Sequence, residues 1–277
     1  MKSRPRFPIL LIFLAFQVGI QAQNNLSGKI IDSDGNPISF VNIGILNKAV
    51  GTVSDEQGNF ILSFRDNLLL DTMVMSCIGF KHQKHLVKSF IDSLSTNGNV
   101  IMEKDVVQLH EVLIERDKLK PYKIGHFTNS WEYRGFMTSR AKGAELATII
   151  YQNKNKTLHL IAFQFNIIKN EFDSLRFRIN IYNVNNEIPD SNLLKRNEVF
   201  LLLKEHDKFK YFFKKDIFIT GDFIISLELL DTFGQSNSEK VFEFTSQEGG
   251  KYYKRFTSHD KWEKFTGVSL GYGLIVN

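Results

Sequence analysis

Residues 28–45, GKIIDSDGNPISFVNIGI, hold the pattern that decides the fold of the first third of the chain. Two apolar runs, 27–32 and 38–46, flank the turn residues Asp34-Gly35-Asn36-Pro37. Asp and Asn side chains bond to nearby backbone, Gly takes a positive φ, and Pro fixes φ. The stretch therefore predicts two strands joined by a tight turn.

The same alternation of short apolar runs and turns continues to residue 114. Asp55-Glu56-Gln57-Gly58-Asn59 is a second turn, and further runs occur at 60–64, 73–76, 80–87, 100–103 and 106–114. Because these runs show no helical period, we expect a small all-β sandwich over residues 24–115.

Several short motifs in this region resemble those of the carboxypeptidase-regulatory-like domain. They are Gly28-Lys29-Ile30-Ile31-Asp32, Gly35-Asn36-Pro37-Ile38, Val41-Asn42-Ile43, Gly51-Thr52-Val53-Ser54-Asp55, Gly58-Asn59-Phe60, Ser76-Cys77-Ile78-Gly79-Phe80 and Gln108-Leu109-His110-Glu111-Val112-Leu113-Ile114. The resemblance implies a transthyretin-like, seven-stranded sandwich. It also implies a place among envelope proteins of Bacteroidota-type bacteria, including the N-terminal extensions of TonB-dependent receptors. The family name does not imply peptidase activity.

Residues 130–277 predict a second, larger β domain of jelly-roll-like type, with about eight strands. Apolar and polar side chains alternate at 177–181 and at 223–229, as expected for strands with one buried face. A short helix is expected around 191–194. The charged stretch 116–129, with Pro121 and Gly125, is the expected linker. This region resembles a domain that follows the regulatory-like module in many envelope proteins of the same bacteria, and the resemblance implies no established activity. It is carried by Gly143-Ala144-Glu145, the run 177–182, Pro189, Leu193-Leu194 and the run 223–228.

Residues 1–22 have the three-part plan of a secretory signal peptide. Lys2, Arg4 and Arg6 precede the apolar run 9–16, and Ala22 precedes the expected cleavage point. The run is too short to span a bilayer, although an uncut anchoring helix is the alternative reading. We therefore expect an exported protein, periplasmic or associated with the outer membrane, with no membrane span after cleavage.

Charge and cysteine content exclude several classes of protein. The formal net charge of the 277-residue chain is +5, and it falls to +2 when the leader's three cations are removed, so no nucleic-acid partner is expected. A single cysteine, Cys77, excludes an internal disulfide framework and a thiolate metal cluster.

The familiar catalytic patterns are missing or incomplete. No histidine has Glu three residues later, so the ligand pair of a zinc carboxypeptidase is absent. Gly267-Val268-Ser269-Leu270-Gly271 matches the nucleophile elbow, but neither Asp nor His follows it. Asp32-Ser33-Asp34-Gly35-Asn36 begins like a calcium loop but has Pro37 and Ile43 where Gly and Glu are needed. We expect no catalytic residue, no metal site and no cofactor, and hence no enzyme.

Aromatic residues give the one binding signal. Trp131, Tyr252, Tyr253 and Trp262 fall in or near expected loops and are the candidate ligand contacts, because aromatic rings stack on the C–H faces of sugars. Closing the ends of the sandwich core is their alternative role. Arg176 and Arg178 lie on one strand face, where solvated cross-strand salt bridges are expected and an anionic partner is the alternative.

The leading hypothesis is an exported, non-enzymatic interaction or scaffold protein of the bacterial cell envelope, with another envelope protein as partner. The alternative is a glycan-binding protein that uses the aromatic residues of the C-terminal domain. A hydrolase with a dispersed site is a third hypothesis. Fold analogy is a weak warrant for any of them.

Overall fold

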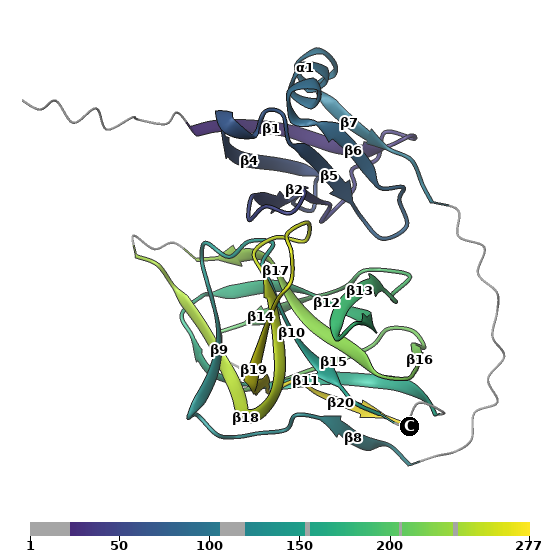
Figure 1. The fold of residues 1–277 in the computed structure, drawn as a ribbon, viewed down its shortest axis with the longest axis vertical. Coiled ribbons are helices and arrows are strands. Elements are labelled where there is room, and N and C mark those ends of the chain that lie inside the picture. Colours follow the sequence, from purple (N-terminus) through teal and green to yellow (C-terminus); the bar gives the residue numbers. More distant parts are fainter. Residues whose placement is uncertain (1–22, 106–119, 153–155, 205–206, 235–237) are drawn as a thin grey trace, which may run out of the picture.

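The computed structural model describes residues 23–105, 120–152, 156–204, 207–234 and 238–277. These residues form two β units, one stacked on the other (Figure 1). The expected signal peptide 1–22 and the expected strand 106–114 lie outside the described residues.

Over residues 23–105 the N-terminal unit is a sandwich of two sheets with seven strands, the number that the family resemblance implies. One sheet has the order β4-β1-β7 and the other the order β3-β2-β5-β6. Strand β7 runs parallel to β1, and the other pairs are antiparallel. The strands are β1 Gln23–Asp32, β2 Asn42–Ile45, β3 Gly51–Val53, β4 Asn59–Arg65, β5 Thr72–Ser76, β6 Gln83–Leu86 and β7 Asn99–Met102; a 3-10 turn spans Asp66–Leu68.

The turns of this unit follow the chemistry expected from the sequence. Oδ1 of Asp32 accepts hydrogen bonds from the backbone N–H groups of Asp34 and Asn36, at 3.0 and 2.9 Å. Asp55 does the same for the turn that precedes β4. Gly35 has a φ of 85°, which a side chain would disfavour. The Asp32 carboxylate is thus used by the turn itself.

One helix, α1 (Val87–Asn97), was not expected from the sequence. The expected strand 80–87 ends at Leu86, where β6 gives way to the helix. Val87, Phe90 and Leu94 are buried at the spacing typical of a helix, and this spacing is the signal that was overlooked. A Cβ on Gly28 would lie 2.9 Å from Leu94, so the absence of a side chain there lets the helix pack on β1.

The C-terminal unit contains a single network of thirteen antiparallel strands. Its main path is β13-β12-β17-β10-β18-β11-β20-β8, with β14 on β12, β15 and β16 on β11, and β9 and β19 on β18. The strands are β8 Tyr122–Gly125, β9 Tyr133–Thr138, β10 Glu145–Ile150, β11 Thr157–Asn170, β12 Ser174–Asn185, β13 Ile188–Asn192, β14 Glu198–Leu203, β15 Lys208–Phe212, β16 Phe218–Thr220, β17 Phe223–Phe233, β18 Val241–Arg255, β19 Glu263–Leu270 and β20 Gly273–Val276. The all-β class is confirmed.

An aromatic core fills this unit. It includes Phe165, Phe177, Phe242, Phe244 and Tyr272, all with 1% or less of their surface exposed. Phe165 contacts Phe242 and Phe244 edge-to-face, with ring centroids 6.2 and 6.1 Å apart, a favourable arrangement for aromatic rings. The abundance of Phe in the sequence thus serves packing.

Two local predictions in this unit were wrong. Residues 188–192 form strand β13, which extends into the region where a short helix was expected at 191–194. Strand β8 lies inside the expected linker 116–129 and pairs with β20. Tyr122 and Ile124 alternate with polar residues, which is a strand pattern, but the charges and Pro121 nearby masked it.

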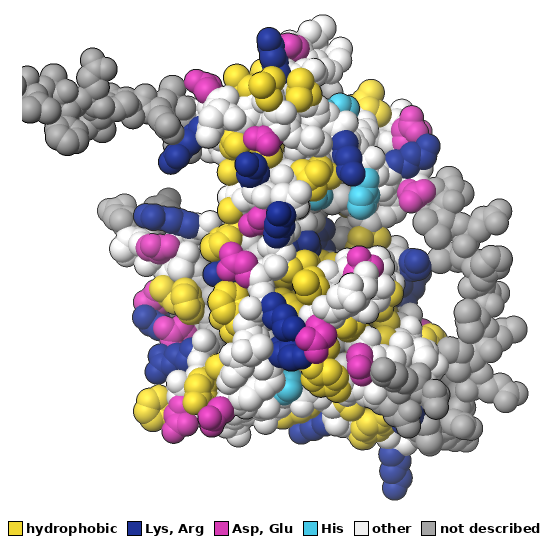
Figure 2. Space-filling model, in the orientation of Figure 1, with side chains coloured by type: hydrophobic (Ala, Val, Ile, Leu, Met, Phe, Trp, Pro, Cys, Tyr) yellow, Lys and Arg dark blue, Asp and Glu magenta, His cyan; other side chains and the backbone are white. Residues whose placement is uncertain are grey.

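Within the described residues, no helix has the length and apolar character needed to cross a bilayer. Figure 2 shows Lys and Arg interspersed with Asp and Glu over the visible face of both units. No broad patch of a single charge covers that face, in agreement with the small net charge expected of the mature chain.

Candidate functional site

The candidate site begins with a set of polar side chains on the outer face of the large sheet. In β12, Phe177, Ile179 and Ile181 enter the core, so Arg178 and Asn180 point the other way. The register places Arg178 opposite Glu228 and Asn180 opposite Ser226 of β17. In the same way Glu145 of β10 lies opposite Arg255 of β18. Four strands thus bring these six residues together.

Arg178 joins the two β units. Its guanidinium makes a bidentate pair with Glu228, with Nε and Nη2 donating over 2.8 and 2.9 Å. Nη2 also donates to Oδ1 of Asn42 at 2.7 Å, and Nη1 donates to the Phe40 carbonyl at 3.0 Å and to Asn197 at 3.1 Å. All five N–H groups of the guanidinium are therefore used, and two of the acceptors belong to the N-terminal unit.

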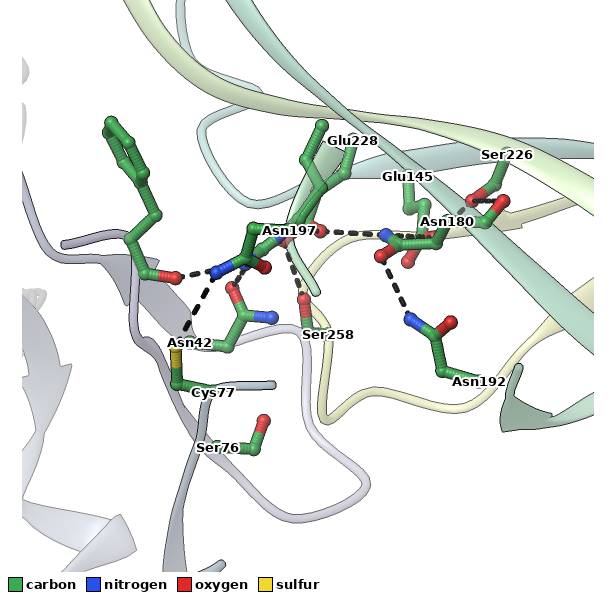
Figure 3. Close-up of polar contacts among 12 residues, drawn as sticks. Asn42, Ser76, Cys77, Glu145, Asn180, Asn192, Asn197, Ser226, Glu228 and Ser258 are labelled. Carbon is green, nitrogen blue, oxygen red and sulfur yellow. Dashed lines mark hydrogen bonds and ion pairs between the residues drawn. The ribbon is translucent and has the colours of Figure 1, made fainter. Parts of the chain in front are cut away.

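The Arg178–Glu228 pair is deeply buried and stays ionised. The side chains of Arg178 and Glu228 are 2% and 0% exposed. Burial by itself would raise the pKa of Glu228, but the charge and hydrogen bonds of Arg178, the hydrogen bond from Asn180 and the charge of Arg255 together outweigh it and hold that pKa below its ordinary value. Glu228 also accepts hydrogen bonds from Asn180 and Ser258, so its oxygens are fully used (Figure 3).

A second buried pair, Glu145 and Arg255, continues the network. Nε of Arg255 donates to Glu145 over 2.8 Å, and the hydroxyl of Tyr182 donates to the other carboxylate oxygen at 2.8 Å. Asn180 donates to both carboxylates and so links the two ion pairs. The Trp262 ring centroid lies 4.3 Å from the Arg255 guanidinium, a close cation–π contact.

The loop between β18 and β19 reaches the N-terminal unit, as Figure 1 shows. The carbonyl of His259 accepts a 2.9 Å hydrogen bond from the backbone N–H of Asn47. A Cβ on Gly51 would lie 2.9 Å from the Thr257 side chain, so Gly51 permits this close approach. Burial lowers the pKa of His259 to about 4, so its ring is neutral at neutral pH.

A cavity of about 570 Å³ opens at this junction. Ser76, Phe80 and His82 line it from the N-terminal unit, and Asn192, Lys195 and Ser258 are among the residues lining it from the C-terminal unit. Arg178 and Arg255 also reach its wall, but their charges are balanced by Glu228 and Glu145. The cavity therefore suits a polar ligand and is not built as a strong anion site.

A Ser–His pair lies at the junction, and the histidine also contacts a backbone carbonyl. Nε2 of His259 lies 3.4 Å from Oγ of Ser76 and 3.3 Å from the carbonyl oxygen of Asn42. A carbonyl oxygen only accepts hydrogen bonds, so this contact requires a proton on Nε2. With that proton in place, Nε2 does not take the Ser76 proton as a general base would.

Ser269 of the nucleophile-elbow motif is completely buried in β19. Among the described residues, no three His, Cys, Asp or Glu side chains are placed to hold a metal ion.

The four aromatic candidates do not form one site. Trp131 is 68% exposed and stands alone before β9. Tyr252 and Tyr253 were expected in or near a loop but lie within β18, where Tyr253 is fully buried and Tyr252 stacks on Phe265. Trp262 precedes β19 and covers Arg255. The loop assignment of the tyrosines was wrong because alternation is broken by a bulge between Glu248 and Lys251.

Three residues of the site were not predicted from the sequence: Glu145, Asn180 and Glu228. Asn180 and Glu228 were expected only as the polar side of strands. Arg176 and Arg178 were expected in solvated cross-strand pairs. Arg178 is in a cross-strand pair, but it is buried, while Arg176 reaches across to Glu56 of the N-terminal unit at 2.9 Å. A polar residue at every second position signals an outward face and does not reveal what covers it.

Comparison with known proteins identifies the N-terminal unit. Residues 26–114 match the CarboxypepD_reg-like domain. The TonB-dependent receptor SusC of Bacteroides thetaiotaomicron is 30% identical over 118 residues, which make up 41% of this chain and 11% of the receptor. The chain thus spans about a tenth of the length of this curated relative.

Among solved structures, similarity is found to the cysteine protease and lectin-like domains of Cwp84, a surface layer associated protein of Clostridium difficile. The identity is 11% and the TM-score is 0.29, with 51% of this chain and 36% of that chain covered.

Proposed function

Since residues 26–114 are a CarboxypepD_reg-like domain, we propose that the chain is an exported binding protein of the bacterial cell envelope that acts without catalysis. Its partner is another envelope component, and its recognition surface is the junction of the two units. The similarity to part of an envelope receptor supports the location. The proposal rests above all on the junction cavity, which is lined from both units.

The rigidity of the junction supports a binding role. Arg178 bonds to Phe40 and Asn42, His259 bonds to Asn47, and Arg176 pairs with Glu56. These contacts hold the cavity walls in one arrangement before any ligand arrives. A preorganised site loses less entropy on binding than one that must first be ordered.

A photo-crosslinking amino acid at Ser191, an exposed residue that lines the cavity, tests this function in intact cells. The matched control carries the same group at Ser95, on the exposed face of α1. We expect one envelope component to be captured from position 191 and not from position 95. Equal capture from both positions, or none from 191, would contradict the proposal. Turnover of peptide, ester or glycoside substrates by the purified protein would contradict the absence of catalysis.

Glycan binding is the second candidate function, and the mixture of polar and apolar side chains in the cavity wall favours it. Asn192, Ser191 and Ser258 offer amide and hydroxyl groups, and Phe80 offers an apolar face. Sugars present the same combination of hydroxyls and C–H faces. If glycan affinity resides here, Ser191→Trp abolishes it, while joint replacement of Trp131, Tyr252 and Trp262 by Ala leaves it intact. If Ser191→Trp kept glycan affinity and the triple Ala variant lost it, the glycan site would lie at the aromatic residues instead.

A further inference from the structure

A second cavity, of about 450 Å³, lies wholly within the C-terminal unit. It is bounded by β9, by the connection from β9 to β10, and by the second half of β18 with β19. We call it the elbow cleft. Most of its wall is apolar, and Met137, Leu146, Val268 and Leu270 are among the residues that line it.

The elbow cleft exists because β18 bends. Gly249 and Gly250 have φ values of 87° and 82°, and the register of β18 with β19 shifts between Glu248 and Lys251. Before this bulge β18 pairs with β9, and after it β18 pairs with β10. A bulge bends the strand and separates the flanking elements, which opens the sheet at this point.

Aromatic rings that are partly open to water surround the cleft. Phe136 is 62% exposed and Phe256 is 48% exposed. Tyr252 and Phe265 stack in parallel, with centroids 4.7 Å apart and planes 8° apart. Large apolar side chains that line a concave site and stay exposed are typical of a surface that binds an apolar group.

The charged residues that line the cleft are all cations. They are Arg134, Lys254 and Arg255, and no acidic side chain joins them in the wall. Their partners Glu243, Glu263 and Glu145 contact them from outside the cleft. Lys254 Nζ lies 4.8 Å from the ring centroid of Phe256 and 5.2 Å from that of Phe265, so the ammonium sits against the aromatic wall. Arg255 is held by Glu145 and Ser258, and Arg134 is held by Glu243 at 2.8 Å. The Lys254–Glu263 pair is longer, at 3.3 Å, and both of its side chains are partly exposed, so Lys254 is the cation that can turn to a ligand's charge.

We propose that the elbow cleft binds a single-chain anionic amphiphile of the fatty-acid type. The apolar chain packs between Phe136, Phe256 and Phe265, and the carboxylate pairs with Lys254. The aromatic and aliphatic wall provides the affinity through burial of the chain. The cationic rim selects an anionic head group over a neutral or cationic one.

The site is separate from the junction cavity and stands whether or not that cavity binds a partner. Only Arg255 lines both, and its guanidinium is held by Glu145 in the buried network. Substitutions at Lys254 and Phe256 therefore test the elbow cleft alone.

Isothermal titration of the purified protein with dodecanoate, below its critical micelle concentration, tests the proposal. We expect one molecule bound per chain, with dodecanol bound at least fivefold more weakly and dodecyltrimethylammonium more weakly still. Lys254→Gln should weaken dodecanoate binding about fivefold and leave dodecanol binding unchanged. Phe256→Ser should weaken both.

The chain offers a matched control pair, Lys210 and Phe212 of β15. Lys210 lies 5.7 Å from the Phe212 ring centroid, and Phe212 is 62% exposed, yet neither lines the elbow cleft. Lys210→Gln and Phe212→Ser should leave both affinities unchanged, and thermal unfolding confirms that every variant is folded. Equal affinity for dodecanoate and dodecanol, equal loss in the control pair, or association only above the micelle concentration would each overturn the proposal.

Discussion

At the scale of single residues, Arg178 is the side chain that we expect to matter most for the stability of the fold. It gives all five N–H groups to acceptors, it is 2% exposed, and it touches both units. Taking two charges out of water is costly, so such a pair is stable only when every donor and acceptor is satisfied. The Arg178–Glu228 pair meets that condition through Asn42, Asn180 and Ser258.

Arg178→Met should lower the free energy of unfolding by about 3–5 kcal/mol, because it leaves the Glu228 carboxylate buried without its cation. Adding Glu228→Gln to that variant should restore part of the loss, because the orphaned charge is then removed. Urea denaturation at neutral pH measures both. Lys81→Gln, which breaks the exposed pair with Glu103, is the control and should leave the free energy of unfolding almost unchanged, because water screens that pair. A double variant no more stable than Arg178→Met would refute the account.

At the scale of elements, the turn of the β12–β13 hairpin is held in place by side chains of two other strands. Asn186 and Glu187 have φ values of 50° and 60°, a conformation that non-glycine residues rarely adopt. The Glu187 carboxylate is held at 2.5 Å by Lys251 of β18, and Lys264 of β19 binds its other oxygen. The hairpin is thereby tied to two other strands.

Hydrogen bonds from Lys251 and Lys264 lower the pKa of Glu187 to about 2 from an ordinary value of 4.5. Because the folded-state pKa is depressed, this stabilisation is present above pH 4.5 and is lost as the pH falls from 4.5 to 2. Glu187→Gln should therefore unfold at a lower temperature than the wild type at pH 7 and at the same temperature near pH 2. Glu132→Gln, at an exposed position, is the control. A difference in unfolding temperature between Glu187→Gln and the wild type that persists unchanged at pH 2 would contradict this explanation of the Glu187 pKa.

Elements were predictable where local chemistry decides them. The turns at Asp32 and Asp55 and the strands that carry Phe177 and Phe223 were predicted from short patterns, and the structure has them. Helix α1, strand β8 and the bend of β18 were not predicted, because their local patterns were weak or competed with nearby charge and proline.

At the scale of the whole molecule, the junction depends on a neutral histidine. His259 lies against Asn42 and Ser76, with Arg255, His82 and Glu228 as the charged or titratable groups near it. Burial holds the pKa of His259 at about 4, below the ordinary 6.5. Protonation of the ring is therefore opposed by the folded junction.

The contribution of His259 to the free energy of unfolding should fall by roughly 3 kcal/mol as the pH drops from 7 to 4, because the unfolded chain protonates this ring near pH 6.5 and the folded chain does so only near pH 4. His259→Gln removes the titrating group and should flatten this part of the pH dependence. His85→Gln, an exposed histidine, serves as control. Urea denaturation at several pH values measures the slope, and an unchanged slope in His259→Gln would rule the mechanism out.

Short patterns in the sequence specify the all-β class, the sandwich of the first third of the chain, its turns, and the faces of the main strands. These features depend on residues a few positions apart, so short patterns report them. Tertiary structure alone decided that the outward row of β12 and β17 is buried. Asn42 and Arg178 are 136 positions apart, and the junction cavity and the elbow cleft are likewise built from distant segments. The periodicity of a strand indicates the face on which a side chain lies, whereas its contacts on that face depend on how distant segments pack in the folded chain.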